Sequence, residues 1–245
     1  NARLIDPEAR TDTLGQLLVT EGRIAQRPDV SEQTDDIAKA AKVNKSAIEI
    51  IDCKGKCLAP GIVDIGVKVC EPGERHKESY RSAGLAAAAG GVTTMVTRPD
   101  TVPAIDSPET LEFVTRRANA AAPVNVRPMA ALTKGREGRE MTEIGFLMDA
   151  GAIAFTDCDH VVTNTKVLLR ALTYARSLGA LVIAHPQEPI LSAGACVTSG
   201  KFASLRGLPA VTPMAERMGL DRDIALLEMT GARYHADQLT TARAL

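Results

Sequence analysis

The pattern of apolar residues changes near Pro60-Gly61. Before this point the apolar runs are short and separated by polar turns, which is typical of a small β-sandwich. The polar stretch 27–47 predicts a loop or a short helix. We therefore assign residues 1–60 to the N-terminal part of a small β-sandwich domain. The predicted strands are 17–19, 22–25 and 48–52.

After Gly61, β-branched apolar runs alternate with helical runs over residues 61–245. Such alternation indicates parallel βα units with both sheet faces covered. One helix opens at Ser107-Pro108-Glu109, a typical N-cap followed by Pro and an acid. The predicted strands are 61–69, 92–97, 124–132, 152–156, 180–185 and 234–239. The other predicted helices are 78–89, 140–150, 163–178 and 214–230.

Two α/β folds satisfy this order, an open Rossmann sheet and a (β/α)8 barrel. No G-x-G-x-x-G follows the first strand, which favours the barrel. About six of the eight units are visible, and a barrel of six units would leave two open edges. The chain also starts without Met. We therefore expect an incomplete barrel, belonging to a longer polypeptide that continues with two more units.

Charge and cysteine content exclude several classes of protein. Lys and Arg number 29 against 30 acidic residues, so no basic field would attract nucleic acid or anionic lipid. No apolar run approaches the roughly 20 residues of a membrane span. The five cysteines are dispersed and no signal peptide precedes them, which indicates reduced thiols in the cytoplasm. Cys53 and Cys57 lack a second pair at zinc-ligand spacing, so we interpret them as ordinary residues.

Several motifs in unbroken order resemble one family. GIVDIGVKVCEPGERHKES (61–79) resembles the first barrel strand of bacterial dihydroorotases, which reads G-hydrophobic-V-D-x-H-V-H-x-R-E-P-G, followed by HKE. AAAAGGVTTMVTRPDT (86–101) is similar to their Gly-rich strand ending in Met-Pro-Asn-Thr. The chain is identified as a member of the dihydroorotase branch of the cyclic amidohydrolases, similar in pattern to bacterial pseudo-dihydroorotases with a degenerate metal site. Further matching segments are 130–157, 178–189, 207–209 and 214–235.

The resemblance implies an amidohydrolase barrel with two zinc ions at its C-terminal mouth. These metals make a hydroxide available and polarise the substrate amide. The implied ligands are a His-x-His, a bridging carboxylate, two more His and a final Asp, which would lie beyond Leu245. The five positions within the chain carry Gly66, Lys68, Asp157, His185 and Gln238. Of these five side chains, only Asp157 and His185 are of a type that binds zinc, whereas a catalytic zinc ion usually has three protein ligands. We therefore assign no metal and no catalytic residue.

The implied substrate site is altered too. Cys70 stands where the family has an Arg that binds the substrate carboxylate, and Asp100 stands where it has Asn. The charge of Asp100 would repel an anionic dihydroorotate. Removal of the metals would leave Asp157 as an uncompensated buried carboxylate. We therefore predict an ion pair between Lys68 and Asp157.

Other ligand-type residues lie near the expected mouth. Cys70, Cys158, Asp159 and His160 could rebuild a single-metal site, and His160 could serve Cys158 as a base. No ligand set at fixed spacing emerges, and neighbours in sequence seldom form a dyad, so we favour ordinary loop residues. We interpret His76 and His235 as structural.

Three functions remain open. The first is a non-catalytic dihydroorotase homologue of pyrimidine biosynthesis, for which the resemblance implies aspartate carbamoyltransferase as partner and a homo-oligomeric state. The second is an active dihydroorotase or related cyclic amidohydrolase with a rebuilt zinc site. The third is a sensor that binds a pyrimidine intermediate without chemistry. We favour the first, with no cofactor.

Overall fold

The computed structural model of this protein describes residues 2–26, 49–242 and 244. The chain divides into two compact units, Asn1–Gly61 and Ile62–Leu245, which are described separately. The prediction for residues 27–47 lies outside the described residues. No helix in the described part of the chain combines the length and the apolar character that a bilayer crossing requires.

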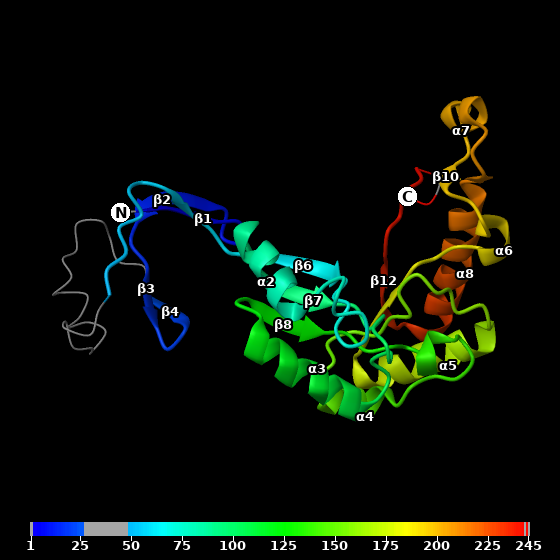
Figure 1. Ribbon diagram of the computed structural model, residues 1–245, viewed down its shortest axis with the longest axis horizontal. Helices are drawn as coiled ribbons and strands as arrows, with labels where there is room; N and C mark the ends of the chain where they lie inside the picture. The colour runs from blue at the N-terminus through cyan, green and yellow to red at the C-terminus, as the bar shows by residue number, and fades with distance from the viewer. Residues whose placement is uncertain (1, 27–48, 243, 245) are drawn as a thin grey trace. The chain divides into compact units, whose positions relative to one another are not determined.

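The first unit contains two small sheets (Figure 1). Strand β1 (Ala2–Asp6) pairs antiparallel with β2 (Thr11–Gly15) and parallel with β5 (Cys57–Leu58). Strands β3 (Leu18–Thr20) and β4 (Arg23–Gln26) form the predicted hairpin.

The strand predicted at 48–52 is wrong for its described residues 49–52, which belong to no strand. The backbone N–H of Lys56 donates to the Cys53 carbonyl at 2.9 Å, closing a turn. Only after this turn does the chain meet β1, with Cys57 opposite Arg3. The apolar run therefore precedes the paired residues, and Ile50 and Ile51 are exposed.

The second unit is a series of parallel strands in chain order. β6 (Ile62–Val67), β7 (Val92–Thr97) and β8 (Asn125–Pro128) form one sheet. β9 (Leu181–Ala184) pairs with β12 (Arg233–Ala236). Phe155 joins the two sheets through parallel bridges to Ala130 and Val182. This order is the one predicted for the wall of a barrel, although the segment predicted as a strand at 152–156 pairs only through Phe155.

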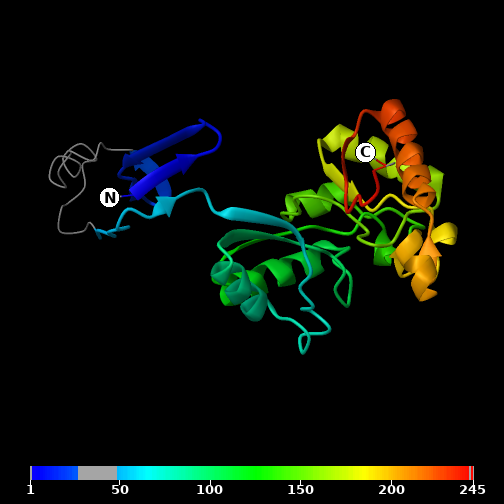
Figure 2. The ribbon, with the colours of Figure 1, turned by 90° about the horizontal axis from the view of Figure 1, so that it is seen from above.

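Helices follow these strands as predicted. α2 and α3 pack on β7 and β8, and Figure 2 shows both helices on one face of these strands. Ser79 and Ser82 form a capping box on α2, and the Ser107 hydroxyl accepts the Thr110 N–H on α3. The helices are α2 (Tyr80–Ala89), α3 (Pro108–Ala121), α4 (Ile144–Asp149), α5 (Thr165–Leu178), α6 (Pro189–Ser192), α7 (Lys201–Arg206) and α8 (Met214–Thr230). The two-residue strands β10 (Val197–Thr198) and β11 (Ala210–Val211) lie between α6 and α8.

One helix begins later than predicted. The pattern placed a helix at 140–150, whereas α4 begins at Ile144. The residues before it fold back on the segment after β8 instead. The Lys134 N–H donates to the Glu140 carbonyl at 2.8 Å, and the Thr142 N–H donates to the Leu132 carbonyl at 3.0 Å. These non-local hydrogen bonds outweigh the local helical pattern.

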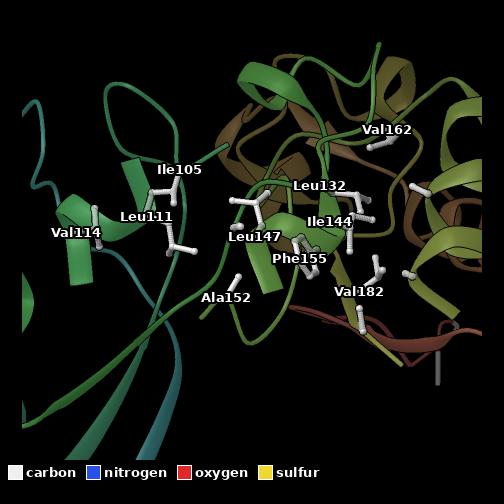
Figure 3. Packing of buried hydrophobic residues seen from close by; sticks show 14 of the residues in the cluster. Ile105, Leu111, Val114, Leu132, Ile144, Leu147, Ala152, Phe155, Val162 and Val182 are labelled. Atoms are coloured by element: carbon white, nitrogen blue, oxygen red, sulfur yellow. The ribbon is translucent and has the colours of Figure 1, made fainter. Parts of the chain in front are cut away.

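The core of the second unit lies between the helices and the strands. Figure 3 shows Leu132, Ile144, Leu147 and Phe155 gathered together, and all four are buried. Helix α5 contributes buried residues at helical spacing: Leu168, Ala171, Leu172 and Ala175. This packing fixes the segments from which the candidate site is built.

Candidate functional site

The residues predicted for the site follow the carboxyl ends of neighbouring parallel strands. Lys68 follows β6, Arg98 and Asp100 follow β7, Asp157 follows Phe155, and His185 follows β9. Parallel strands bring these ends to one edge of the sheet, where barrel enzymes carry their active sites.

Asp157 is fully engaged in holding a loop. Its Oδ1 accepts the backbone N–H groups of Leu132 (3.0 Å) and Thr133 (2.9 Å), and its Oδ2 accepts the Thr133 hydroxyl. Burial raises the pKa of Asp157 above its ordinary value, and the hydrogen bonds from Thr133 and Leu132 offset this effect only in part. The structure therefore gives Asp157 a scaffolding role at the position where the resemblance implies a bridging carboxylate.

Lys68 pairs with Asp100, so the predicted ion pair between Lys68 and Asp157 is wrong. Lys68 Nζ lies 2.9 Å from Asp100 Oδ2, and Arg98 Nη2 lies 3.4 Å from the same oxygen. The reason is topological. Lys68 and Asp100 follow adjacent strands, whereas Asp157 follows a strand segment beyond β8.

The charge of Asp100 is thus compensated. Its side chain is only 2% exposed and faces two cations. We expected the charge of Asp100 to repel an anionic dihydroorotate, and its pairing with Lys68 and Arg98 weakens that repulsion. Hydrogen bonding to Asp100 is the main cause that raises the pKa of Lys68 above its ordinary value.

Two arginines from different loops, Arg98 and Arg136, approach the carboxylate of Asp159 at this edge of the sheet. Asp159 Oδ1 lies 3.3 Å from Arg98 Nη2 and 3.6 Å from Arg136 Nη1. Arg136 ends a 3-10 turn, Lys134–Arg136. Its backbone carbonyl lies 3.0 Å from His160 Nδ1.

The two retained ligand types share a small cavity. Asp157 and His185 both line a space of about 10 Å³, close to the minimum for one water molecule. His185 Nε2 lies 3.0 Å from Gln187 Oε1, while its buried Nδ1 has no hydrogen-bond partner among the described residues. Gly66, Lys68 and Gln238 are not on this lining.

Helix α8 approaches the segment after His185 closely. A Cβ on Gly219 would lie 2.3 Å from the backbone nitrogen of Gln187, so only glycine permits this approach. The Glu188 N–H also donates to the Ala215 carbonyl at 2.8 Å. These contacts position the loop that follows His185.

Two of the other positions where the resemblance implies metal ligands, 66 and 238, have a positive φ, a backbone conformation that favours glycine. Gly66 has φ +95° at an irregularity in the pairing of β6 with β7, and Gln238 has φ +57°. A histidine at position 66 would have to adopt a conformation that side chains rarely accept. Restoring the ligand type there would therefore strain the strand.

The alternative metal ligands do not assemble either. In residues 2–26, 49–242 and 244, no three His, Cys, Asp or Glu side chains form a group that could hold a metal ion. Cys158 is buried at φ +60°, and burial raises the pKa of its thiol, which disfavours a nucleophilic thiolate. Cys70 is buried as well, and His76 and His235 are exposed. Among the residues that the structure describes, the donor set does not fit zinc.

Sequence reasoning missed Arg98, Arg136 and Thr133. A signal existed for Arg98, because it stands at the Met of the family's Met-Pro-Asn-Thr, two residues before Asp100. The positions of Arg136 and Thr133 in a long loop carried no comparable signal.

Comparisons with known proteins agree with this architecture. The family described as Dihydro-orotase-like matches residues 55–243. A dihydroorotase from Syntrophobacter fumaroxidans is 36% identical over all of this chain and 54% of its own length. A dihydroorotase-like protein from Pseudomonas putida is 38% identical over 99% of this chain and 54% of its own length.

Solved structures show the same fold. The L-hydantoinase of Arthrobacter aurescens matches with a TM-score of 0.72 and 19% identity, over 96% of this chain and 51% of its own. The D-hydantoinase of a Thermus species matches with a TM-score of 0.72 and 20% identity, over 100% of this chain and 52% of its own. The predicted fold, an incomplete α/β barrel, is thereby confirmed, and the chain spans about half the length of the proteins it matches. The chain belongs to the dihydroorotase-like family.

Proposed function

We propose that this protein is a non-catalytic dihydroorotase homologue of pyrimidine biosynthesis, acting in the cytoplasm as a homo-oligomer and as a structural partner of aspartate carbamoyltransferase. Family membership supports the pathway. The partner and the oligomeric state rest on the resemblance to pseudo-dihydroorotases.

The observation that carries the proposal is the Lys68–Asp100–Arg98 ion-pair group at the edge where the family holds zinc. The raised pKa of Lys68 keeps its side chain as an ammonium at neutral pH, and an ammonium offers no lone pair to a metal. Arg98 adds a second fixed positive charge. Two cations held by Asp100 at 2.9 and 3.4 Å oppose the binding of a dication electrostatically.

The retained Asp157 does not weaken this proposal. Hydrolysis in the family relies on a metal-bound hydroxide, which Asp157 and His185 together are too few to support. The hydrogen bonds that Asp157 accepts from Leu132 and Thr133 explain its presence without chemistry.

The first test is metal content together with turnover. Full-length protein, purified beside an active dihydroorotase, is incubated with excess zinc, dialysed and analysed by elemental analysis. We expect less than about a tenth of an equivalent of zinc and no hydrolysis of dihydroorotate, because the reaction needs the metal hydroxide. Stoichiometric zinc with turnover would instead support an active cyclic amidohydrolase.

The second test concerns the partner. Tagged protein is co-expressed with aspartate carbamoyltransferase from the same organism, and the complex is isolated by affinity and size-exclusion chromatography. We expect a stable complex of fixed stoichiometry. Elution of two separate proteins at micromolar concentration would contradict the proposed structural role. It would not affect the proposal that the protein is non-catalytic.

A further inference from the structure

We propose that the pair Arg98 and Arg136 binds a small organic carboxylate, at the place that the Asp159 carboxylate occupies in this structure. This inference goes beyond the proposed function, because a structural partner needs no ligand at the barrel mouth. It rests on the contacts of three side chains.

The first step is the state of the two guanidinium groups. Their side chains are only 14% and 15% exposed, and they reach the same point from different loops. A guanidinium offers five N–H donors, and buried donors are normally satisfied. Yet the Nε of Arg98 and the Nε of Arg136 are both buried without a hydrogen-bond partner among the described residues.

Arg98 interacts with the Cys158 side chain, and the contacts that the two arginines make with oxygen atoms are long. Arg98 Nη2 lies 3.3 Å from Asp159 Oδ1 and 3.4 Å from Asp100 Oδ2. Arg136 Nη1 lies 3.4 Å from the Asp157 carbonyl and 3.6 Å from Asp159 Oδ1. Charge-assisted bonds to a well-seated carboxylate are about 2.7–2.9 Å long. Asp159 therefore satisfies the pair incompletely, and an untethered carboxylate could approach both guanidinium groups more closely.

Asp159 can leave without unfolding its loop. Its backbone is fixed by a tight turn, in which the His160 N–H donates to the Asp157 carbonyl at 3.1 Å and Cys158 adopts φ +60°. Its side chain, however, is 66% exposed and can rotate into solvent.

The charges at this edge favour one added anion. Lys68, Arg98 and Arg136 are cations. With Asp159 turned away, Asp100 still pairs with Lys68 and Arg98, but the ion pair of Arg136 is removed. The buried Asp157 accepts hydrogen bonds from Leu132 and Thr133 through its two oxygens, and it also interacts electrostatically with Arg136. A monovalent carboxylate restores the balance that Asp159 provides. A phosphate dianion would add a second charge near Asp100 and Asp157.

The test measures competition between a free carboxylate and Asp159. Sodium acetate is titrated into full-length protein against sodium chloride of equal ionic strength, and the Nε–Hε resonances of Arg98 and Arg136 are followed by NMR. In Asp159→Asn we expect acetate to bind about tenfold more tightly than in the unmodified protein. The reason is that the Asp159 carboxylate, which is attached to the chain, competes with acetate at a millimolar effective concentration. Asp221→Asn removes a half-exposed acid on α8 that also pairs with an arginine, and it should leave the affinity unchanged.

Arg136→Gln should weaken acetate binding at least tenfold, with Arg206→Gln as the exposed control. Asp159→Asn keeps the proposal testable even where Arg136→Gln fails to fold, since Asp159 is mostly exposed. Acetate acting no better than chloride on Asp159→Asn, or phosphate binding where acetate does not, would overturn the proposal. Detection of zinc-dependent turnover would contradict the proposed function alone, without changing this result.

Discussion

The ion pair between Lys68 and Asp100 predicts a measurable coupling free energy. The perturbation is a double-mutant cycle of Lys68→Met and Asp100→Asn. Methionine keeps most of the apolar stem and asparagine keeps the shape, so the cycle isolates the charge interaction. Each single variant leaves the other charge at the edge of the sheet without its closest partner.

The magnitude follows from distance and burial. At an effective dielectric constant of about 20, two unit charges 2.9 Å apart attract by about 6 kcal/mol. The Lys68 side chain is 55% exposed, so solvent screening removes most of this energy, whereas Asp100 is buried. We therefore expect a coupling free energy of about 1–2 kcal/mol, above the value of a surface ion pair and below that of a fully buried one.

The assay is urea unfolding of the four proteins at pH 7. The raised pKa of Lys68 means that its contribution is complete below the ordinary value of 10.5 and is lost as the pH rises through the higher folded-state pKa. Coupling should therefore be the same at pH 7 and pH 9. The exposed pair Lys134–Glu140 provides the control cycle, with about 0.5 kcal/mol or less expected. A Lys68–Asp100 coupling no larger than this control would refute the reasoning.

Two further predictions concern the segments around α8. Glu216 accepts hydrogen bonds from the backbone N–H and hydroxyl groups of Thr240 and Thr241, so Glu216→Gln, with one acceptor oxygen, should accelerate amide exchange at Thr240 about 10- to 100-fold. Burial alone would raise the pKa of Glu216, but these hydrogen bonds lower it. Protection of the Thr240 amide from exchange should therefore be complete above pH 4.5 and should fall as the pH drops below that value. Protection that does not change with pH would argue against this role. Gly219→Ala would place a Cβ 2.3 Å from the Gln187 nitrogen and should lower the free energy of unfolding in urea by about 3 kcal/mol. In the control Gly90→Ala the nearest atom to the Cβ lies at 3.5 Å, so the free energy of unfolding should change by less than about 0.5 kcal/mol. Equal effects of the two substitutions would be inconsistent with the Gly219 contact.

Local signals account for most of the fold that could be predicted. The strand at 92–97 and the helix before Gly179 agree with β7 and α5, because β-branched runs and cap residues act over a few neighbours. The strands β1 and β2 were missed, since ARLID and TDTLG carry little apolar alternation and depend on pairing with each other. The late start of α4 has the same kind of cause, because Thr142 bonds to the distant Leu132 carbonyl.

Part of the candidate site could be predicted in its residues, but its contacts could not. Motif spacing located Gly66, Lys68 and Asp157, and simple chemistry showed that two of them are not metal ligands. The partner of Lys68 depended on which strand lies beside β6, and local patterns do not contain that information. The meeting of Arg98 with Arg136 likewise depends on two loops whose paths are set by tertiary hydrogen bonds.

The hydrogen bonds that Asp157 accepts bear on how a conserved type of residue at a barrel mouth is interpreted. An acid that anchors a loop through Leu132 and Thr133 stabilises the fold whether or not the protein catalyses a reaction. Position 66 on the first strand carries no side chain, and Lys68 pairs with Asp100 instead of anchoring a loop. An aspartate at the place of Asp157 can therefore be retained for architecture alone, so its presence does not by itself indicate activity.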